Sequence, residues 1–253
     1  MTKRKKIVVF SLITIIVVSF CWLDFVFVKE NSQVFGQELK EAGAVSDVVI
    51  IFNSGGYGTV APEKAYDFKP IIDNLKSEIE KMNYKAAVVP YYRTQETIIG
   101  KIGYTKEMFF FFPSESRDLA ENIKKFIEEN PKDKVLLAGL SNGAGFVRAA
   151  MSNLQGMNNV FAVEMGTPFW SKEIESNNIL ILNNEGRDIL SIGDKSQLML
   201  SLVEAPLKWI ESKVEGKNIS LAEALSIPGH QYAWSEVETA VVPFLTSKLL
   251  SKN

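Results

Sequence analysis

A serine flanked by small residues is the first feature of this sequence that points to chemistry. Ser141 is the centre of a Gly-x-Ser-x-Gly pentapeptide, residues 139–143, between an apolar run at 135–138 and a helical pattern at 146–154. A sharp turn between a strand and a helix lifts a serine hydroxyl clear of a sheet, and glycines let the two elements pass closely. This context predicts a nucleophile at Ser141. An ordinary glycine-rich turn in which the serine caps the helix is the alternative.

The only histidine of the chain, His230, is the candidate base. It lies in a Pro-Gly loop downstream of Ser141 and before the last predicted helix. Imidazole exchanges protons near neutral pH, so it can take the proton of a serine hydroxyl as the serine attacks. The order serine, acid, histidine is known for such triads. We therefore predict a catalytic role for His230, against the alternative of an ordinary surface or core histidine.

The acid of such a triad is expected after a strand that lies between the serine and the histidine. The apolar run 179–182 is the predicted strand, and Asp188 lies in the turn that leaves it. We predict Asp188 as the acid, with Glu185 and Asp194 as alternatives. Asp188 could instead pair locally with Arg187 or cap the next helix.

Acyl transfer also needs backbone N–H groups that hold the oxyanion. The N–H of Asn142, at the start of the helix after the serine, is one predicted donor. The glycine-rich loop 53–58 follows the first predicted strand and supplies the second, with Gly56 as first choice and Gly55 or Tyr57 as alternatives. The loop has neither the phosphate-loop pattern nor the dinucleotide-binding pattern, and we expect no cofactor.

The pattern of apolar residues predicts the elements that must position this chemistry. Short apolar runs alternate with amphipathic helical patterns, as in a parallel sheet covered by helices. The fold class is therefore α/β, with a mainly parallel sheet flanked by helices over residues 47–253. Pro243 is expected to kink or split the last helix. The predicted strands lie at residues 48–52, 86–91, 135–138, 160–163 and 179–182, and the predicted helices begin near residues 70, 114, 146, 197 and 235.

The N-terminus has the pattern of a membrane segment. Basic residues at positions 3–6 precede a run of 17 uncharged residues at 7–23, and the apolar stretch extends to residue 28. As a helix, residues 7–28 would span about 33 Å, about the thickness of a hydrocarbon core. We predict a signal anchor at 1–28 that places the rest of the chain outside the cytoplasm, with a cleaved signal peptide as the alternative. Residues 29–46 are polar and are predicted to form a linker.

Composition excludes several classes of protein. The chain has 253 residues, of which 46% are apolar and 23% charged, a globular balance. Residues 7–253 contain 24 of the 28 basic side chains and all 30 acidic ones, so the body lacks the basic surface of a nucleic-acid binder. A single cysteine cannot form an intrachain disulfide, and no Cys/His cluster has the spacing of a metal site.

Taken together, residues 47–250 resemble the α/β-hydrolase superfamily, in particular its lipases and esterases. The resemblance rests on the serine pentapeptide, the loop 53–56, the candidate acid and the late histidine. Residues 165–168 are also similar to a Gly-Thr-Pro turn that many lipases have after the strand following the serine. The resemblance implies a serine nucleophile, an acyl-enzyme intermediate and no cofactor. It departs from the family at Asn53-Ser54, where His-Gly is usual, and in lacking the first strands of the full fold.

The predicted function is hydrolysis of a carboxylic ester by a membrane-anchored serine hydrolase. The aromatic run 108–113 and Trp170 favour a lipid or other hydrophobic ester as substrate, although that run could equally be core packing. Arg93 and Arg148 could bind an anionic group of a substrate or could be ordinary solvated charges. An acyltransferase with the same triad and a non-catalytic, membrane-anchored binding protein of the same fold are the alternatives.

Overall fold

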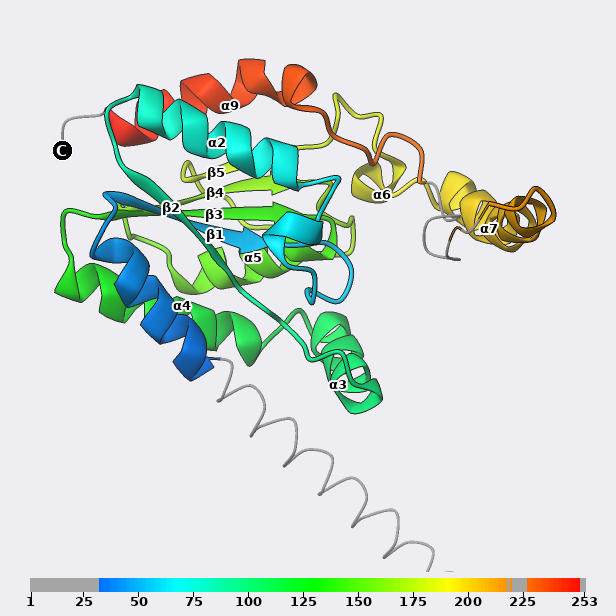
Figure 1. The fold of residues 1–253 in the computed structure, drawn as a ribbon, viewed down its shortest axis with the longest axis horizontal. Helices are drawn as coiled ribbons and strands as arrows, with labels where there is room; N and C mark the ends of the chain where they lie inside the picture. Colours follow the sequence, from blue (N-terminus) through cyan, green and yellow to red (C-terminus); the bar gives the residue numbers. More distant parts are fainter. Residues whose placement is uncertain (1–31, 218, 220–226, 251–253) are drawn as a thin grey trace, which may run out of the picture.

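The fold is built on a parallel sheet with the strand order β2-β1-β3-β4-β5. The computed structural model describes residues 32–217, 219 and 227–250 (Figure 1). The three inner strands are Val/Ile/Leu-rich and buried almost throughout, because helices cover both faces of a parallel sheet. This confirms the predicted fold class. The strands are β1 (Val48–Asn53), β2 (Ala86–Pro90), β3 (Lys134–Leu140), β4 (Val160–Met165) and β5 (Ile179–Leu182).

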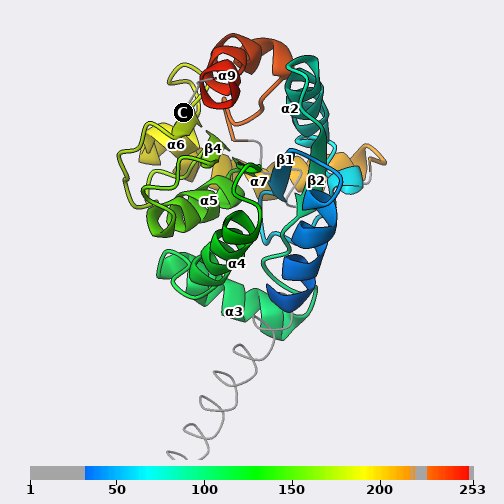
Figure 2. The same ribbon diagram turned by 90° about the vertical axis from the view of Figure 1, so that its left-hand side faces the viewer.

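Helices form a layer on each face of the sheet (Figures 1 and 2). α2 and α9 cover one face, and α4, α5 and a helix over residues 32–43 cover the other. A hydrophobic core lies on each face of the sheet, and successive side chains of β1 point into opposite ones. Ile50 packs toward α2 and α9, whereas Ile51 packs toward α4 and α5. The helices are α2 (Lys69–Lys81), α3 (Ile98–Phe109), α4 (Glu115–Glu129), α5 (Asn142–Asn153), α6 (Ile189–Ile192), α7 (Lys195–Val214) and α9 (Trp234–Leu249), with a 3-10 turn η1 (Pro62–Lys64).

One part of the chain differs from the expectation, and one of the two outcomes expected at Pro243 does not occur. Residues 32–43 form a helix and not a polar linker, because Phe35 and Leu39 lie on one face of it and are buried in the α4–α5 core. Pro243 does not split α9, which runs from Trp234 to Leu249. Pro243 lies on the exposed face, while the buried side chains of the same helix hold it against the sheet. The domain therefore begins earlier in the sequence than predicted.

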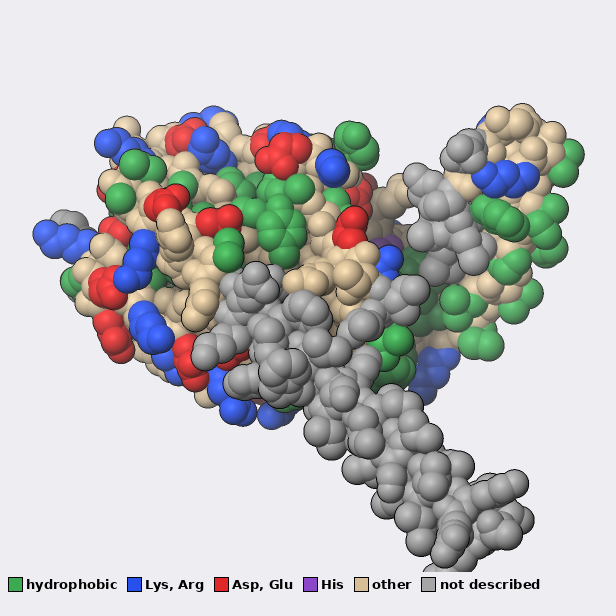
Figure 3. Space-filling model, turned by 60° about the horizontal axis from the view of Figure 1, so that its bottom comes forward, with side chains coloured by type: hydrophobic (Ala, Val, Ile, Leu, Met, Phe, Trp, Pro, Cys, Tyr) green, Lys and Arg blue, Asp and Glu red, His purple; other side chains and the backbone are tan. Residues whose placement is uncertain are grey.

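α7 projects from the body beyond the carboxyl ends of the strands (Figures 1 and 3). Many of its large apolar side chains are exposed, which is unusual for a helix of a water-soluble domain. These residues are Met199, Leu200, Leu202, Val203, Leu207, Ile210 and Val214. Within the described residues, no helix combines the length and the apolar character needed to cross a bilayer. The predicted signal anchor, residues 1–28, lies outside the described residues.

Candidate active site

The turn after β3 holds Ser141 in a strained conformation. Its backbone has φ 57° and ψ −125°, a region that side-chain-bearing residues rarely adopt. A Cβ on Gly139 would lie 2.7 Å from the carbonyl oxygen of Gly143, and a Cβ on Gly143 would lie 2.3 Å from that of Asn53. Both small residues are therefore required for β3, α5 and the loop after β1 to meet here. The N–H of Ser141 donates to Met165 O at 2.9 Å, which ties the turn to the end of β4.

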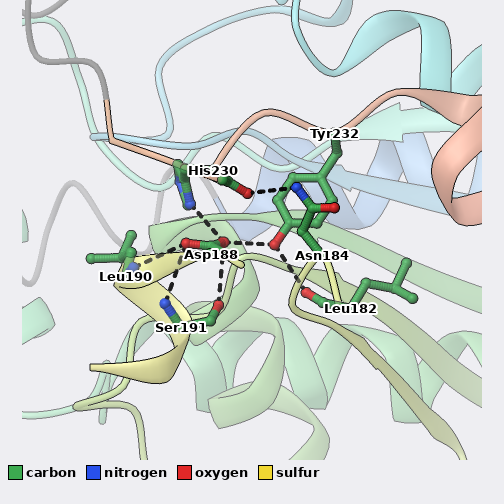
Figure 4. Close-up of polar contacts among 8 residues, drawn as sticks. Leu182, Asn184, Asp188, Leu190, Ser191, His230 and Tyr232 are labelled. Atoms are coloured by element: carbon green, nitrogen blue, oxygen red, sulfur yellow. Dashed lines mark hydrogen bonds and ion pairs between the residues drawn. The ribbon is translucent and has the colours of Figure 1, made fainter. Parts of the chain in front are cut away.

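The turn after β5 brings the candidate acid and base together. His230 Nδ1 lies 2.9 Å from Asp188 Oδ2, and the Asp188 side chain is fully buried (Figure 4). Asp188 Oδ1 accepts hydrogen bonds from the N–H groups of Leu190 at 3.0 Å and Ser191 at 3.3 Å, so the same carboxylate caps α6. Capping of the next helix was the alternative role for Asp188, and its carboxylate makes both this cap and the contact with His230.

The other candidate acids lie elsewhere. Glu185 is exposed and sits 3.7 Å from the Arg187 guanidinium. Asp194 caps α7 by accepting hydrogen bonds from the N–H groups of Ser196 and Gln197, each at 3.1 Å. Neither has a contact with His230 among the described residues.

Tyr232 is a further member of the site that the sequence analysis did not find. Its hydroxyl donates to Asp188 Oδ2 at 2.6 Å and lies 3.2 Å from Leu182 O (Figure 4). Burial raises the pKa of Asp188, but hydrogen bonds from His230 and Tyr232 outweigh it and hold the pKa below its usual value. Burial and the bond to Asp188 raise the pKa of Tyr232 well above its usual value, so Tyr232 stays a donor. Its only sequence signal is its place two residues after the histidine.

Gly166 connects the serine turn with the acid and the base. It follows Met165, the acceptor of the Ser141 N–H, and has φ +63°. A Cβ on Gly166 would lie 2.5 Å from His230 Cε1 and 2.9 Å from Asp188 Oδ2, so the imidazole packs directly over this glycine. No hydrogen bond joins the Ser141 hydroxyl to His230 within the described part of the chain. Because Asp188 occupies Nδ1, Nε2 is the ring nitrogen left for a serine, and such bonds often tighten only with substrate.

Unused backbone donors lie beside Ser141. The N–H groups of Asn142, Gly55, Gly56 and Tyr57 donate no hydrogen bond to any described residue. A Cβ on Gly55 would lie 3.5 Å from Ser141 Cβ, so the loop after β1 packs against the serine. Gly56 has φ +57° and no heavy atom within 4 Å of its Cβ position, which leaves room for a ligand. These N–H groups are available to an oxyanion.

A buried arginine fixes this loop. Arg93, only 2% exposed, donates hydrogen bonds to Ser54 O and to the Tyr104 hydroxyl, and its Nη2 lies 3.4 Å from Gly56 O. Tyr104 in turn donates to Gly56 O at 2.8 Å. Burial raises the pKa of Tyr104 to about 12, so it remains a neutral donor. Arg93 is therefore an anchor of the loop and not a solvated charge.

The aromatic run 108–113 divides between core and surface. Phe112 is buried, with its ring 5.5 Å from the Phe146 ring in an edge-to-face contact. Phe110 is 67% exposed and Phe111 47% exposed, and both line a cavity next to α5. Among the described residues, no group of three His, Cys, Asp or Glu side chains is placed to hold a metal ion.

The parallel sheet with helices on both faces is an α/β architecture, and the strained serine turn and the acid–histidine pair lie at one end of its strands. The candidate residues all lie at the carboxyl ends of β1, β3, β4 and β5, where open α/β sheets bind their ligands.

Comparisons with known proteins give similarity to solved structures alone. No family model matches the sequence, and no curated protein matches it. A solved structure of Trichoderma reesei cutinase in complex with a phosphonate inhibitor superposes with a TM-score of 0.48 at 16% identity, over 93% of this chain and 99% of that chain. At this level the similarity is modest, and the function proposed below rests on the geometry of the chain itself.

Proposed function

We propose that this protein is a serine hydrolase that cleaves carboxylic esters, with Ser141 as nucleophile, His230 as general base and Asp188 as the residue that orients the imidazole. The observation that supports this most directly is the 2.9 Å contact between His230 and the buried Asp188. The imidazole packs over Gly166, the residue after Met165, whose carbonyl oxygen accepts the Ser141 N–H. A structural aspartate needs no histidine partner, and a structural serine needs no strained φ.

The proposed reaction has two halves. Ser141 Oγ bonds to the ester carbonyl carbon while His230 Nε2 takes the hydroxyl proton, and the carbonyl oxygen becomes an oxyanion held by the N–H groups of Asn142 and Gly56. The carbon–oxygen bond to the alcohol then breaks, and the imidazolium returns the proton to the leaving alcohol. A water attacks the acyl-enzyme with His230 again as base, which releases the carboxylic acid and restores the serine.

The proposal also covers the kind of ester, the acceptor of the acyl group and the location of the protein. Exposed aromatic side chains beside the serine and the exposed apolar face of α7 favour an ester with an apolar portion. An acyltransferase would share the acyl-enzyme and differ only in using an alcohol or amine in place of water. The membrane anchor at residues 1–28 and an extracytoplasmic site remain predictions from the sequence.

Covalent labelling of the full-length protein by a fluorophosphonate probe tests the proposal. We expect an adduct on Ser141 in the wild type and none in Ser141→Ala or His230→Ala, whereas Ser247→Ala, a hydroxyl deletion on the exposed face of α9, still labels. A folded wild type that does not label would contradict the proposed nucleophile. If the serine labels, hydrolysis of a p-nitrophenyl ester with and without added alcohol acceptors separates the two reactions, since a transferase forms new ester at the expense of free acid.

A further inference from the structure

A cavity of about 270 Å³ lies along α5, the helix that follows the proposed nucleophile. It lies between the start of α4, one side of α5 and the loop 168–174 that follows β4. Asn142, the residue after the serine, lines it, and so does Pro168, two residues after the glycine under the imidazole. The cavity therefore reaches the residue that follows Ser141.

The cavity combines an aromatic wall with positive charge. Phe110, Phe111 and Trp170 line one part of it. The lining also includes Arg117, Arg148 and Lys172, serine and asparagine side chains and further apolar residues, and no described lining residue is acidic. Arg117 and Lys172 are exposed, and neither forms a salt bridge within the described part of the chain. Arg117 does interact with the neighbouring Asp118, since burial raises the pKa of that carboxyl and the charge of Arg117 partly opposes the rise.

Arg148 is held in place by a buried carboxylate. It is 9% exposed, and its Nε and Nη2 bond to Glu164 Oε2 at 2.8 and 2.7 Å. Glu164, on β4, is fully buried and also accepts a hydrogen bond from Thr167 at 3.1 Å. This leaves Nη1 as the guanidinium nitrogen without a described partner. Buried ion pairs often contribute little net stability, so an arginine fixed next to a cavity points to a role in binding.

We propose that this cavity binds a carboxylate at the far end of a short acyl chain, so that the substrate is an anionic ester. The inference rests on the proposed function and names its substrate class. The apolar part of the acyl chain packs on Phe110, Phe111 and Trp170. The carboxylate is held by Arg148 Nη1, Arg117 and Lys172 together, so that all three charges contribute to binding. A volume of about 270 Å³ is large enough for a short acyl chain with one charged end.

A matched pair of substrates tests this directly. p-Nitrophenyl hexanoate and mono-p-nitrophenyl adipate have acyl chains of equal length and differ in the terminal carboxylate. We expect kcat/KM to favour the adipate ester by about tenfold or more at low salt, because charge-assisted hydrogen bonds are strong and exposed charges are screened as salt rises. Replacing Arg117 and Lys172 together, as R117Q and K172Q, should remove most of that preference. Lys124→Gln, on the exposed side of α4, should keep it.

A binding measurement separates failure of this inference from failure of the proposed function. In Ser141→Ala, which cannot form an acyl-enzyme, monomethyl adipate should bind more tightly than methyl hexanoate by calorimetry, and R117Q with K172Q should remove most of the difference. Equal affinities, or a preference that the double replacement leaves intact, would overturn the anionic site. Absence of turnover with both p-nitrophenyl esters, accompanied by preferential binding of monomethyl adipate, would refute the hydrolase proposal alone. Arg148 is left unchanged because its loss would bury Glu164 without a counter-ion.

Discussion

Substituting Gly166 by alanine tests whether the imidazole must sit over this residue. The added Cβ would lie 2.5 Å from His230 Cε1, where ordinary contacts begin at 3.4 Å, so the ring must move by about 0.9 Å. A displacement of that size breaks the 2.9 Å contact with Asp188 or turns Nε2 away from the serine. Misplacing a catalytic group by about 1 Å costs roughly 100-fold, and we expect a loss of that order in kcat/KM for a p-nitrophenyl ester.

The matched control is Gly156→Ala. Gly156 also has positive φ, +84°, but nothing lies within 4 Å of its Cβ position, and it sits between α5 and β4 away from the candidate residues. Both variants carry the strain of positive φ, about 1–2 kcal/mol, which lowers the melting temperature by a few degrees in a domain of this size. Only Gly166→Ala should lose activity. If its kcat/KM stays within about threefold of the Gly156→Ala value, the assignment of His230 as the base is wrong.

Other perturbations should separate positioning from folding. Tyr232→Phe removes a donor to Asp188 and raises the pKa of that carboxyl. A carboxyl whose pKa is lower in the folded than in the unfolded chain stabilises the fold at pH values above the unfolded-chain pKa, and this stabilisation is lost as the pH falls through the folded-state pKa. The free energy of unfolding of the variant in urea should therefore be lower than that of the wild type by about 2 kcal/mol at neutral pH. The difference should shrink in acid. Arg93→Gln should lower kcat by about 100-fold and destabilise the fold, and the milder Tyr104→Phe, which removes one bond to the same loop, should lower kcat with a stability loss of about 1 kcal/mol. Replacing residues 196–225 by a short Gly-Ser linker should leave fluorophosphonate labelling intact, and loss of labelling in a folded variant would show that α7 supports the site.

The sequence predicted the elements well where local pattern and burial agree. Every strand of the sheet was found within about two residues, because a strand covered on both faces is a continuous apolar run. The steric reason given for the small residues around Ser141 is visible in the close approaches at Gly139 and Gly143. The catalytic roles of Ser141, His230 and Asp188 stay predictions until they are measured.

The residues that the sequence did not reveal act across long separations. Arg93 bonds to a loop 39 residues upstream, and Tyr232 bonds to an aspartate 44 residues upstream. No local periodicity marks such partners, since each depends on how the strands are ordered in the sheet. α3 was missed for a different reason: its sequence mixes glycine, tyrosine and β-branched residues, which have weak helix propensity, and Thr97 starts it by accepting the N–H of Gly100 at 3.0 Å.

Contacts between the loop around Asp188 and the loop around His230 hold the acid and the base together. The N–H of Ile189 donates to Pro228 O at 3.3 Å, and Asn184 Nδ2 donates to Gly229 O at 3.0 Å. A Cβ on Gly229 would lie 2.1 Å from Arg187 O, so the returning loop packs directly on the loop that holds Asp188. These contacts therefore join the chain just before α6 and α7 to the chain just after them. Because these contacts join the two loops directly, we expect a change in the position of α7 to leave the contact between His230 and Asp188 intact.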